Sequence, residues 1–269
     1  MEQKSKRHVK KGQKKIAIIR LILVLVLIAS LIYLAVYFLK PKDDENTNNI
    51  DDMENIEDLP EVDTTTEDIS KIDSKFVEKV KELQQENSDV KGWIKIDGTG
   101  VNYPMVQTTD NNYYVRRNYK KESSRYGSIF INYKSDIKDV NSNVIIYGHD
   151  MKNDSQMFGD LIKYIDKNFY NEHPIITIAT DEEESEYEII SVFKSRIFYE
   201  GEEDNEFVYY HCFDFNNKEE YNYYVSNSKA IALYDTGKTA KYGEQIITLI
   251  TCEYSQENGR LVVVAKKIS

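Results

Sequence analysis

Cysteine is scarce in this chain, which has only Cys212 and Cys252 among its 269 residues. Two cysteines are too few for a disulfide-rich scaffold, although outside the cell these two could pair. The sequence also lacks the CxxC and HExxH patterns and the clustered histidines that are typical of metal sites. It has no glycine-rich phosphate loop and no dinucleotide-binding fingerprint. We therefore expect no metal and no cofactor.

Basic residues are in the minority, and the net charge is -11. Eight of the 35 lysines and arginines crowd into residues 1–20, and the rest of the chain has an excess of acidic residues. An acidic folded region excludes nucleic acid as its main partner. We interpret residues 1–20 as a basic tail on the cytoplasmic side of a membrane, for the reason given next.

Charge is absent from residues 21–39, where Ser30 is the one clearly polar residue. A helix of this length spans roughly the 30 Å core of a bilayer. Basic residues precede the segment and acidic ones follow it, which predicts a single-pass anchor with the remainder of the chain outside the cell. A cleaved secretory signal is the alternative, but its apolar region is usually only about 7–15 residues long. Residues 40–70, rich in Asp, Glu, Asn and Thr, are predicted to form a disordered acidic tether.

The remaining residues, 71–269, show many short apolar runs and few helical patterns, which predicts a mainly β, closed or nearly closed barrel. Helical spacing indicates an N-terminal helix from about Ile72 to Leu83, a helix capped by Asp154 or Ser155, and another over residues 218–228. The predicted strands are residues 92–96, 101–106, 128–133, 143–147, 175–179, 187–193, 207–210, 246–251 and 260–266.

The run 248–252 ends at Cys252, and after a short polar segment Arg260 opens a second apolar run. The Asn258-Gly259 pair favours a tight turn, so the two runs predict a hairpin with Cys252 and Arg260 side by side. A cation beside a thiol favours the thiolate and can bind an oxyanion. The alternatives are a buried structural cysteine and a surface ion pair of Arg260 with Glu253 or Glu257.

His149 follows Tyr147 and Gly148 at the end of another predicted strand. A histidine there can project from a loop and act as general acid and base, because imidazole titrates near neutral pH. The alternative is an ordinary surface or packing histidine.

These motifs, in this order, resemble the sortases, cysteine transpeptidases of Gram-positive cell surfaces. The resemblance runs from about Ile72 to the C-terminus and favours class B, on the Tyr147–Met151 block, the Gly127–Phe130 run and the ending at residues 260–266. It implies a sortase-type barrel with an N-terminal helix and a helix between the sixth and seventh strands. It also implies Cys252, His149 and Arg260 as catalytic residues.

Further site residues come from the same resemblance. It implies a peptide groove lined by Asn111, Val115, Tyr147, Ile250, Thr251 and Glu253, with Phe207 and Val208 as the opposite wall. Ile250 is a departure, because many class B members have Ser two positions before the cysteine, and a hydrogen bond to the peptide is lost with that hydroxyl.

The implied activity is cleavage of a C-terminal sorting signal on a secreted protein, of the NPxT-N/G or [SP]PxTG type, through a thioacyl intermediate. Transfer to an amine of a cell-wall peptide precursor, or of a pilin subunit, would follow. Two alternatives stay open on the sequence: an extracellular cysteine peptidase or amidase that uses water, and a non-enzymatic surface-binding domain.

Overall fold

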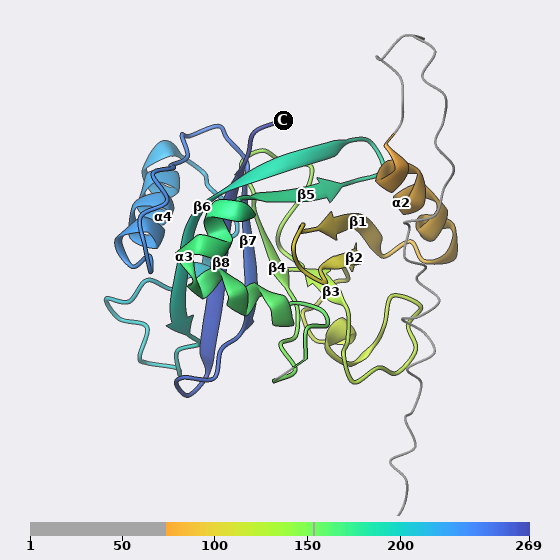
Figure 1. Ribbon diagram of the computed structural model, residues 1–269, viewed down its shortest axis with the longest axis horizontal. Coiled ribbons are helices and arrows are strands. Elements are labelled where there is room, and N and C mark those ends of the chain that lie inside the picture. The colour runs from red at the N-terminus through yellow and green to blue at the C-terminus, as the bar shows by residue number, and fades with distance from the viewer. Residues whose placement is uncertain (1–73, 153) are drawn as a thin grey trace, which may run out of the picture. The chain divides into compact units, whose positions relative to one another are not determined.

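The computed structural model describes residues 74–152 and 154–269, and the strands of this part close into a barrel (Figure 1). The strands are β1 (Val90–Lys95), β2 (Asn102–Val106), β3 (Ile129–Ile131), β4 (Asn143–Tyr147), β5 (Ile175–Ala179), β6 (Glu184–Arg196), β7 (Ile246–Cys252) and β8 (Gly259–Lys267). Their order around the barrel is β1-β2-β3-β4-β7-β8-β6-β5, and β5 pairs back onto β1. The pairs β2/β3 and β4/β7 are parallel. The predicted closed barrel is confirmed.

Two longer helices accompany the barrel, both at predicted places. The helix α2 (Lys75–Glu86) begins after Ser74, whose hydroxyl accepts a hydrogen bond from the Phe76 N–H and so satisfies one of the unpaired donors of the first turn. The helix α4 (Lys218–Ala230) is capped in the same way by Asn217 and lies between β6 and β7 in the chain. The predicted N-terminal helix and the helix between the sixth and seventh strands are therefore confirmed.

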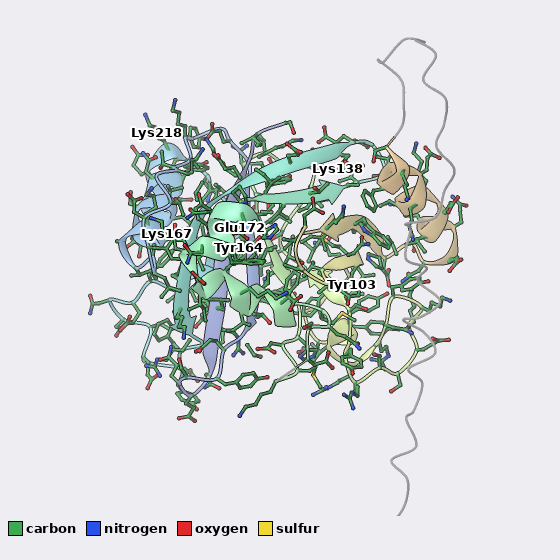
Figure 2. All side chains as sticks on the ribbon, viewed as in Figure 1. Tyr103, Lys138, Tyr164, Lys167, Glu172 and Lys218 are labelled. Carbon is green, nitrogen blue, oxygen red and sulfur yellow. The ribbon has the colours of Figure 1, made fainter. Side chains whose placement is uncertain are left out.

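Short helical turns fill the connections. They are η3 (Tyr113–Arg116), η4 (Gly159–Ile165), α3 (Lys167–Glu172) and η5 (Tyr209–His211). Figure 2 places Tyr164 on η4, with Lys167 and Glu172 of α3 beside it. The Tyr164 side chain is buried in the hydrophobic core, and its hydroxyl donates to the His173 carbonyl oxygen at 2.8 Å, which ties η4 to the C-terminal end of α3.

Two predictions of local structure were wrong. Residues 207–210 form no strand: the segment turns into the 3-10 helix η5. Both edges of β6 are already occupied, by β5 and β8, so this aromatic segment has no strand edge to join and packs its rings instead. The helix expected from Asp154 or Ser155 begins only at Gly159, as the 3-10 turn η4, and Asp154 accepts from the Gln156 N–H in a preceding turn.

Hydrophobic side chains form two clusters on opposite faces of the sheet. The inner cluster takes residues from all eight strands and fills the barrel; it includes Ile94, Met105, Ile129, Val144, Ile146, Ile178, Ile189, Ile247, Leu249, Leu261 and Val263. The outer cluster joins the other face of β4, β6, β7 and β8 to η5 and α4; it includes Ile145, Phe193, Tyr209, Phe215, Tyr221, Tyr224, Ile246, Ile250, Val262 and Val264. Because side chains alternate along a strand, β7 is buried on both faces.

Residues 1–73 lie outside the described part of the chain, and with them the predicted basic tail, anchor and acidic tether. Within residues 74–269, apart from Asn153, no helix has both the length and the apolar character needed to cross a bilayer.

Candidate active site

The β7–β8 hairpin brings Cys252 and Arg260 together. They are Cα partners in the antiparallel ladder, so their side chains leave the sheet on the same face. Asn258 adopts a left-handed conformation (φ 53°), and the Glu253 N–H donates to the Gly259 carbonyl oxygen at 3.0 Å. A Cβ at position 259 would stand 2.3 Å from the Glu253 carbonyl oxygen, so glycine is required for this close turn. The predicted juxtaposition of thiol and guanidinium follows from local sequence alone.

The parallel β4/β7 pair places His149 at the same end of the sheet. Tyr147 is the register partner of Ile250, and two hydrogen bonds continue the contact: Gly148 N–H to the Ile250 oxygen (3.2 Å) and Thr251 Oγ1 to the Gly148 oxygen (2.9 Å). His149 and Cys252 each stand two residues beyond that register pair. Within β7 a step of two residues preserves the face, so Cys252 belongs to the face of Ile250, which is that of the outer cluster, and His149 follows in the loop at the same end of the sheet.

The His149 ring is oriented by a neighbouring loop. Its Nε2 lies 2.9 Å from the carbonyl oxygen of Val115 in η3. A carbonyl oxygen only accepts hydrogen bonds, so Nε2 carries the proton and Nδ1 is left as the basic nitrogen of the neutral ring. Val115, predicted to line the groove, thus contributes its backbone to the site.

The hydrogen bonds of the Arg260 side chain go to backbone oxygens of its own hairpin. Its Nη1 donates to the carbonyl oxygens of Asn258 (3.2 Å) and Gly259 (2.8 Å). The two acidic residues considered as partners are engaged elsewhere: Glu253 pairs with Lys194 at 2.9 Å, and Glu257 accepts from the Tyr199 hydroxyl at 2.7 Å. Within residues 74–152 and 154–269, Arg260 forms no ion pair with a carboxylate.

The two cysteines are both free, so the pairing left open on the sequence does not occur. They differ in environment. Burial, with the nearby Glu220 charge, raises the pKa of the Cys212 thiol to about 11, and its Sγ contacts the Val208 carbonyl oxygen at 3.8 Å. Cys212 is therefore protonated at neutral pH and inert as a nucleophile. Cys252, at a strand end beside a cation, is the thiol that the fold presents.

Two acidic residues, Asp150 and Glu253, are neighbours in sequence of His149 and Cys252. Asp150 follows His149 and is buried; burial and the charges of Asp154 and Glu253 raise the pKa of its carboxyl to about 6. Burial acts in the same direction on Glu253, but hydrogen bonds from Ser255 and Lys194 hold the pKa of its carboxyl below the usual value. The Tyr254 hydroxyl donates to the Asp150 carbonyl oxygen and ties the β7–β8 loop to the loop after His149.

The predicted groove residues occupy different environments. Asn111 accepts through Oδ1 from the Tyr133 N–H at 3.0 Å, and the Tyr147 hydroxyl bonds Asn132 Nδ2 at 3.0 Å. Ile250, Thr251 and Glu253 are buried, at 2%, 2% and 7% exposure, and their side chains contact the protein's own groups. The other three predicted residues of this groove wall, Asn111, Val115 and Tyr147, are half-buried.

The segment from residue 207 to residue 213 covers the face of the sheet beside Cys252 and Arg260. Phe207 and Val208 are half-buried there, and the Phe207 ring contacts those of Phe193 (6.2 Å), Tyr209 (6.4 Å) and Tyr224 (5.5 Å). That Phe207 and Val208 form the second wall of a peptide groove stays a prediction. Tyr209 was missed by the sequence analysis, because a strand over residues 207–210 gives no reason to single it out.

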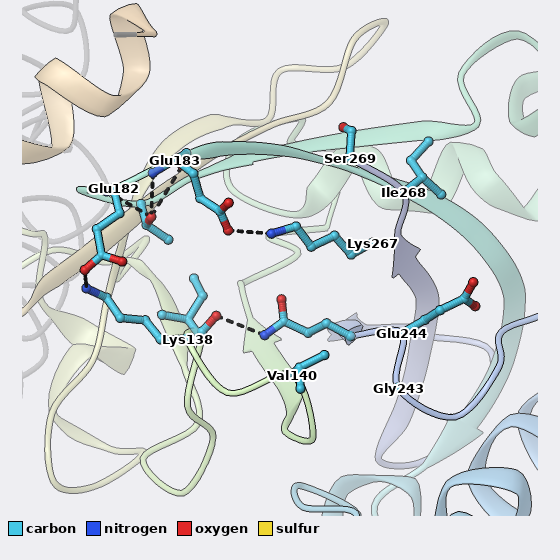
Figure 3. Close-up of a pocket in the computed structure, with 12 residues that line it drawn as sticks. Lys138, Val140, Glu182, Glu183, Gly243, Glu244, Lys267, Ile268 and Ser269 are labelled. Carbon is cyan, nitrogen blue, oxygen red and sulfur yellow. Dashed lines mark hydrogen bonds and ion pairs between the residues drawn. The ribbon is translucent and has the colours of Figure 1, made fainter. Parts of the chain in front are cut away.

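One surface hollow with a cluster of charges lies away from this site. A surface hollow lined by Lys138, Glu182, Glu183, Gly243, Gln245 and Lys267 stands where β8 ends and before β7 begins, at the opposite end of these strands from Cys252 (Figure 3). Its lysines are neutralised by ion pairs with Asp181, Glu182 and Glu183. In the part of the chain that the structure describes, no group of His, Cys, Asp and Glu side chains is arranged to hold a metal ion.

Comparison with known proteins connects this geometry to a family. Residues 94–268 match the family model of the Sortase domain. Sortase B of Listeria monocytogenes is 34% identical over 194 residues, which are 71% of this chain and 75% of that protein. Sortase B of Staphylococcus aureus is 34% identical over 188 residues, 69% of this chain and 73% of that protein.

Solved structures agree in fold. A mutant form of Clostridium perfringens sortase B superposes with a TM-score of 0.64 at 34% identity, covering 71% of this chain and 87% of that one. A Staphylococcus aureus sortase B–substrate complex gives 0.64 at 31% identity, covering 72% and 86%. A sortase B complexed with triglycine gives 0.63 at 31% identity, covering 71% and 86%.

Proposed function

This chain belongs to the sortase family of cysteine transpeptidases, and from that premise we propose its catalytic residues, its substrates and its location. Cys252 is the nucleophile, His149 the general acid and base, and Arg260 the oxyanion-binding residue. The observation that carries the assignment is the register pairing of Cys252 with Arg260, with His149 at the end of the adjoining parallel strand.

The reaction follows from these positions. The Cys252 thiolate attacks the carbonyl carbon of the Thr in the sorting signal, and the carbonyl oxygen takes the negative charge of the tetrahedral intermediate. Guanidinium N–H groups of Arg260 bind that oxygen; removing such a donor typically costs about 2.7–4 kcal/mol in the barrier. When the C–N bond breaks, protonated His149 gives its proton to the departing amine. An incoming amine, deprotonated by His149, then attacks the thioacyl carbon, and Cys252 leaves as thiolate.

The substrates are proposed from the relatives. Sorting-signal peptides and amine nucleophiles are supported by the substrate and triglycine complexes of sortase B. We assign a C-terminal signal of the NPxT-N/G or [SP]PxTG type on a secreted protein, and an amine of a cell-wall peptide precursor as acceptor. Ile250, which bears no hydroxyl, is the residue most apt to shift the preferred motif.

The location is proposed from the sequence. Residues 21–39 form a single-pass membrane anchor with the N-terminus in the cytoplasm, and the catalytic domain stands outside the cell on the acidic segment 40–70. This arrangement delivers the domain to the surface on which exported proteins and wall precursors meet.

The test uses the full chain in detergent with fluorogenic peptides of both signal types, with and without triglycine, and product analysis by mass spectrometry. We expect cleavage after Thr, a thioacyl adduct on Cys252 and an amide-linked triglycine product. Cys252→Ala should abolish all three, and Cys212→Ala, which removes the inert thiol, should leave them unchanged.

Two outcomes would contradict the proposal. Hydrolysis that ignores triglycine would identify a peptidase that uses water. Cleavage that persists in Cys252→Ala would remove Cys252 from the mechanism.

A further inference from the structure

The Tyr209 hydroxyl is an exception among the buried tyrosines of this domain. The side chain is fully buried, and its oxygen has no hydrogen-bond partner within the described residues. Comparable tyrosines are satisfied: Tyr221 donates to the Glu244 carbonyl oxygen (2.8 Å), Tyr224 bonds Thr248 (2.6 Å) and Tyr187 donates to Gln245 (2.7 Å). A buried hydroxyl without a partner costs stability that a phenylalanine would not cost. Its presence in this fold therefore needs a physical explanation.

The position of the ring narrows the explanation. The Tyr209 ring packs edge-on against Phe193 (5.5 Å between centroids, 84° between planes). Phe193 is the register partner of Val262, and Arg260 stands two residues before Val262 on the same face of β8. Tyr209 thus lies over the stretch of β8 that carries Arg260.

The charge of Arg260 acts on this hydroxyl. Burial raises the pKa of Tyr209 far above its usual value, and the Arg260 guanidinium is the largest influence in the opposite direction. The same charge opposes the effect of burial on the pKa of Tyr147. The charge of Arg260 therefore reaches both phenols, but Tyr147 already has Asn132 as its partner.

The Arg260 guanidinium has N–H donors beyond those that it uses in the hairpin. Only Nη1 is engaged among the described residues, and it donates to the carbonyl oxygens of its own hairpin at residues 258 and 259. In that orientation the planar guanidinium of Arg260 is held by the β7–β8 turn. To bind an oxyanion above Cys252 the fork has to face the groove, and in that pose it needs a second fixed acceptor.

We propose that Tyr209 is a positioning residue for Arg260. When the sorting peptide occupies the groove, the guanidinium leaves the carbonyls of residues 258 and 259, donates one N–H to Tyr209 Oη and presents another to the substrate carbonyl oxygen. The unpartnered hydroxyl is the acceptor kept for that pose. This inference rests on the proposed oxyanion-binding role of Arg260.

The experiment compares the full chain with its Tyr209→Phe variant, which loses only the hydroxyl. We expect kcat to fall about 10- to 100-fold, which is the size of one hydrogen bond to a charged group, with KM nearly unchanged. The melting temperature should stay equal or rise, because an unsatisfied buried oxygen is removed. Tyr221→Phe is the matched control in the same cluster: it breaks a satisfied bond to Glu244, near the start of β7 and so at the opposite end of that strand from Cys252. It should lower the melting temperature and leave kcat unchanged.

A double-mutant cycle tests whether the effect passes through Arg260. Acylation of Cys252 is followed by mass spectrometry over hours in Arg260→Lys and in Arg260→Lys/Tyr209→Phe. Because the shorter ammonium has no planar fork for Tyr209 to orient, we expect the two to acylate at the same rate.

Two results would overturn the inference. One is a Tyr209→Phe variant with wild-type kcat. The other is an equal fold-loss from Tyr209→Phe in the wild-type and Arg260→Lys backgrounds, which would mean that the phenol acts on the substrate directly. Failure of the proposed function itself is distinguishable: Cys252→Ala would retain turnover if Cys252 were not the nucleophile, and Arg260→Lys would acylate at the wild-type rate if Arg260 did not bind the oxyanion.

Discussion

The two faces of β7 do different work although they belong to one strand. Ile247 and Leu249 point into the barrel and join a purely packed inner cluster. Thr248, Ile250 and Cys252 point to the other face, where hydroxyls, a thiol and the Arg260 guanidinium are mixed with aromatic rings. The inner face therefore contributes apolar packing. The outer face buries polar groups as well, which stabilises the fold less, and it carries the proposed catalytic residues. Variants of neighbouring residues can separate the two contributions.

The largest effect is expected at the rim of the outer face. Arg260→Ala should reduce kcat/KM about 100- to 1000-fold, the range seen when an oxyanion donor is removed. It should change the free energy of unfolding by less than about 0.5 kcal/mol, because its side chain is half-buried and unpaired with a carboxylate among the described residues. Peptide cleavage and urea unfolding measure the two quantities. A large loss of stability would show that Arg260 is part of the packing, which would contradict the separation between the packed inner face and the catalytic outer face.

Leu249→Ala tests the inner face of the same strand. Truncating a fully buried leucine in a closed barrel should lower the free energy of unfolding by about 2–5 kcal/mol. Since Leu249 points away from the groove, the fraction that remains folded should retain wild-type kcat. Urea unfolding and initial rates on the same sample check both statements, and a kcat loss beyond the unfolded fraction would indicate that the two faces are coupled.

Thr248→Val, one residue earlier, tests the outer face without touching the catalytic residues. Thr248 bonds the Tyr224 hydroxyl at 2.6 Å and Asn143 Oδ1 at 2.8 Å, all three side chains being fully buried. Valine keeps the shape and leaves two buried polar atoms unsatisfied, so stability should fall by about 1–3 kcal/mol. Thermal unfolding beside Leu249→Ala provides the comparison; an unchanged stability would mean that the Tyr224 hydroxyl and the Asn143 side chain satisfy each other without Thr248.

How much of this site was predictable depends on sequence distance. Cys252 and Arg260 face each other in a β-hairpin, so the strand pattern and the turn residues were sufficient to predict the pair. His149 reaches the site through the parallel pairing of β4 with β7, two strands far apart in the chain, which no local pattern encodes. The strand-end position made His149 a candidate, but only the family resemblance indicated that it belongs to the same site as Cys252.

The connection between β6 and α4 was predicted incorrectly for a related reason. The run of Phe207, Val208 and Tyr209 resembles a strand, and only the closure of the barrel, which occupies both edges of β6, forbids one. The unpartnered Tyr209 hydroxyl is less predictable still, because an absent hydrogen bond depends on the positions of all neighbouring chain segments that the structure describes.

The last effect concerns pH and the loop that follows His149, in contrast to the apolar inner face. The pKa of the Asp150 carboxyl is about 6 in the fold and 3.8 in its ordinary state, so the folded protein binds this proton more tightly than the unfolded chain. Its ionisation therefore costs stability: the cost is absent below about pH 4, grows up to about pH 6 and is constant above that.

Asp150→Asn removes this cost, and we expect the stability difference between variant and wild type to be roughly 2 kcal/mol more favourable to the variant at pH 7.5 than at pH 4. Urea unfolding at several pH values measures the gap. The deficit of Leu249→Ala should stay constant over the same range, because the inner face loses only apolar contacts there. A pH-independent Asp150→Asn difference would mean that solvent reaches the carboxylate, and the loop after His149 would then be less buried than its geometry indicates.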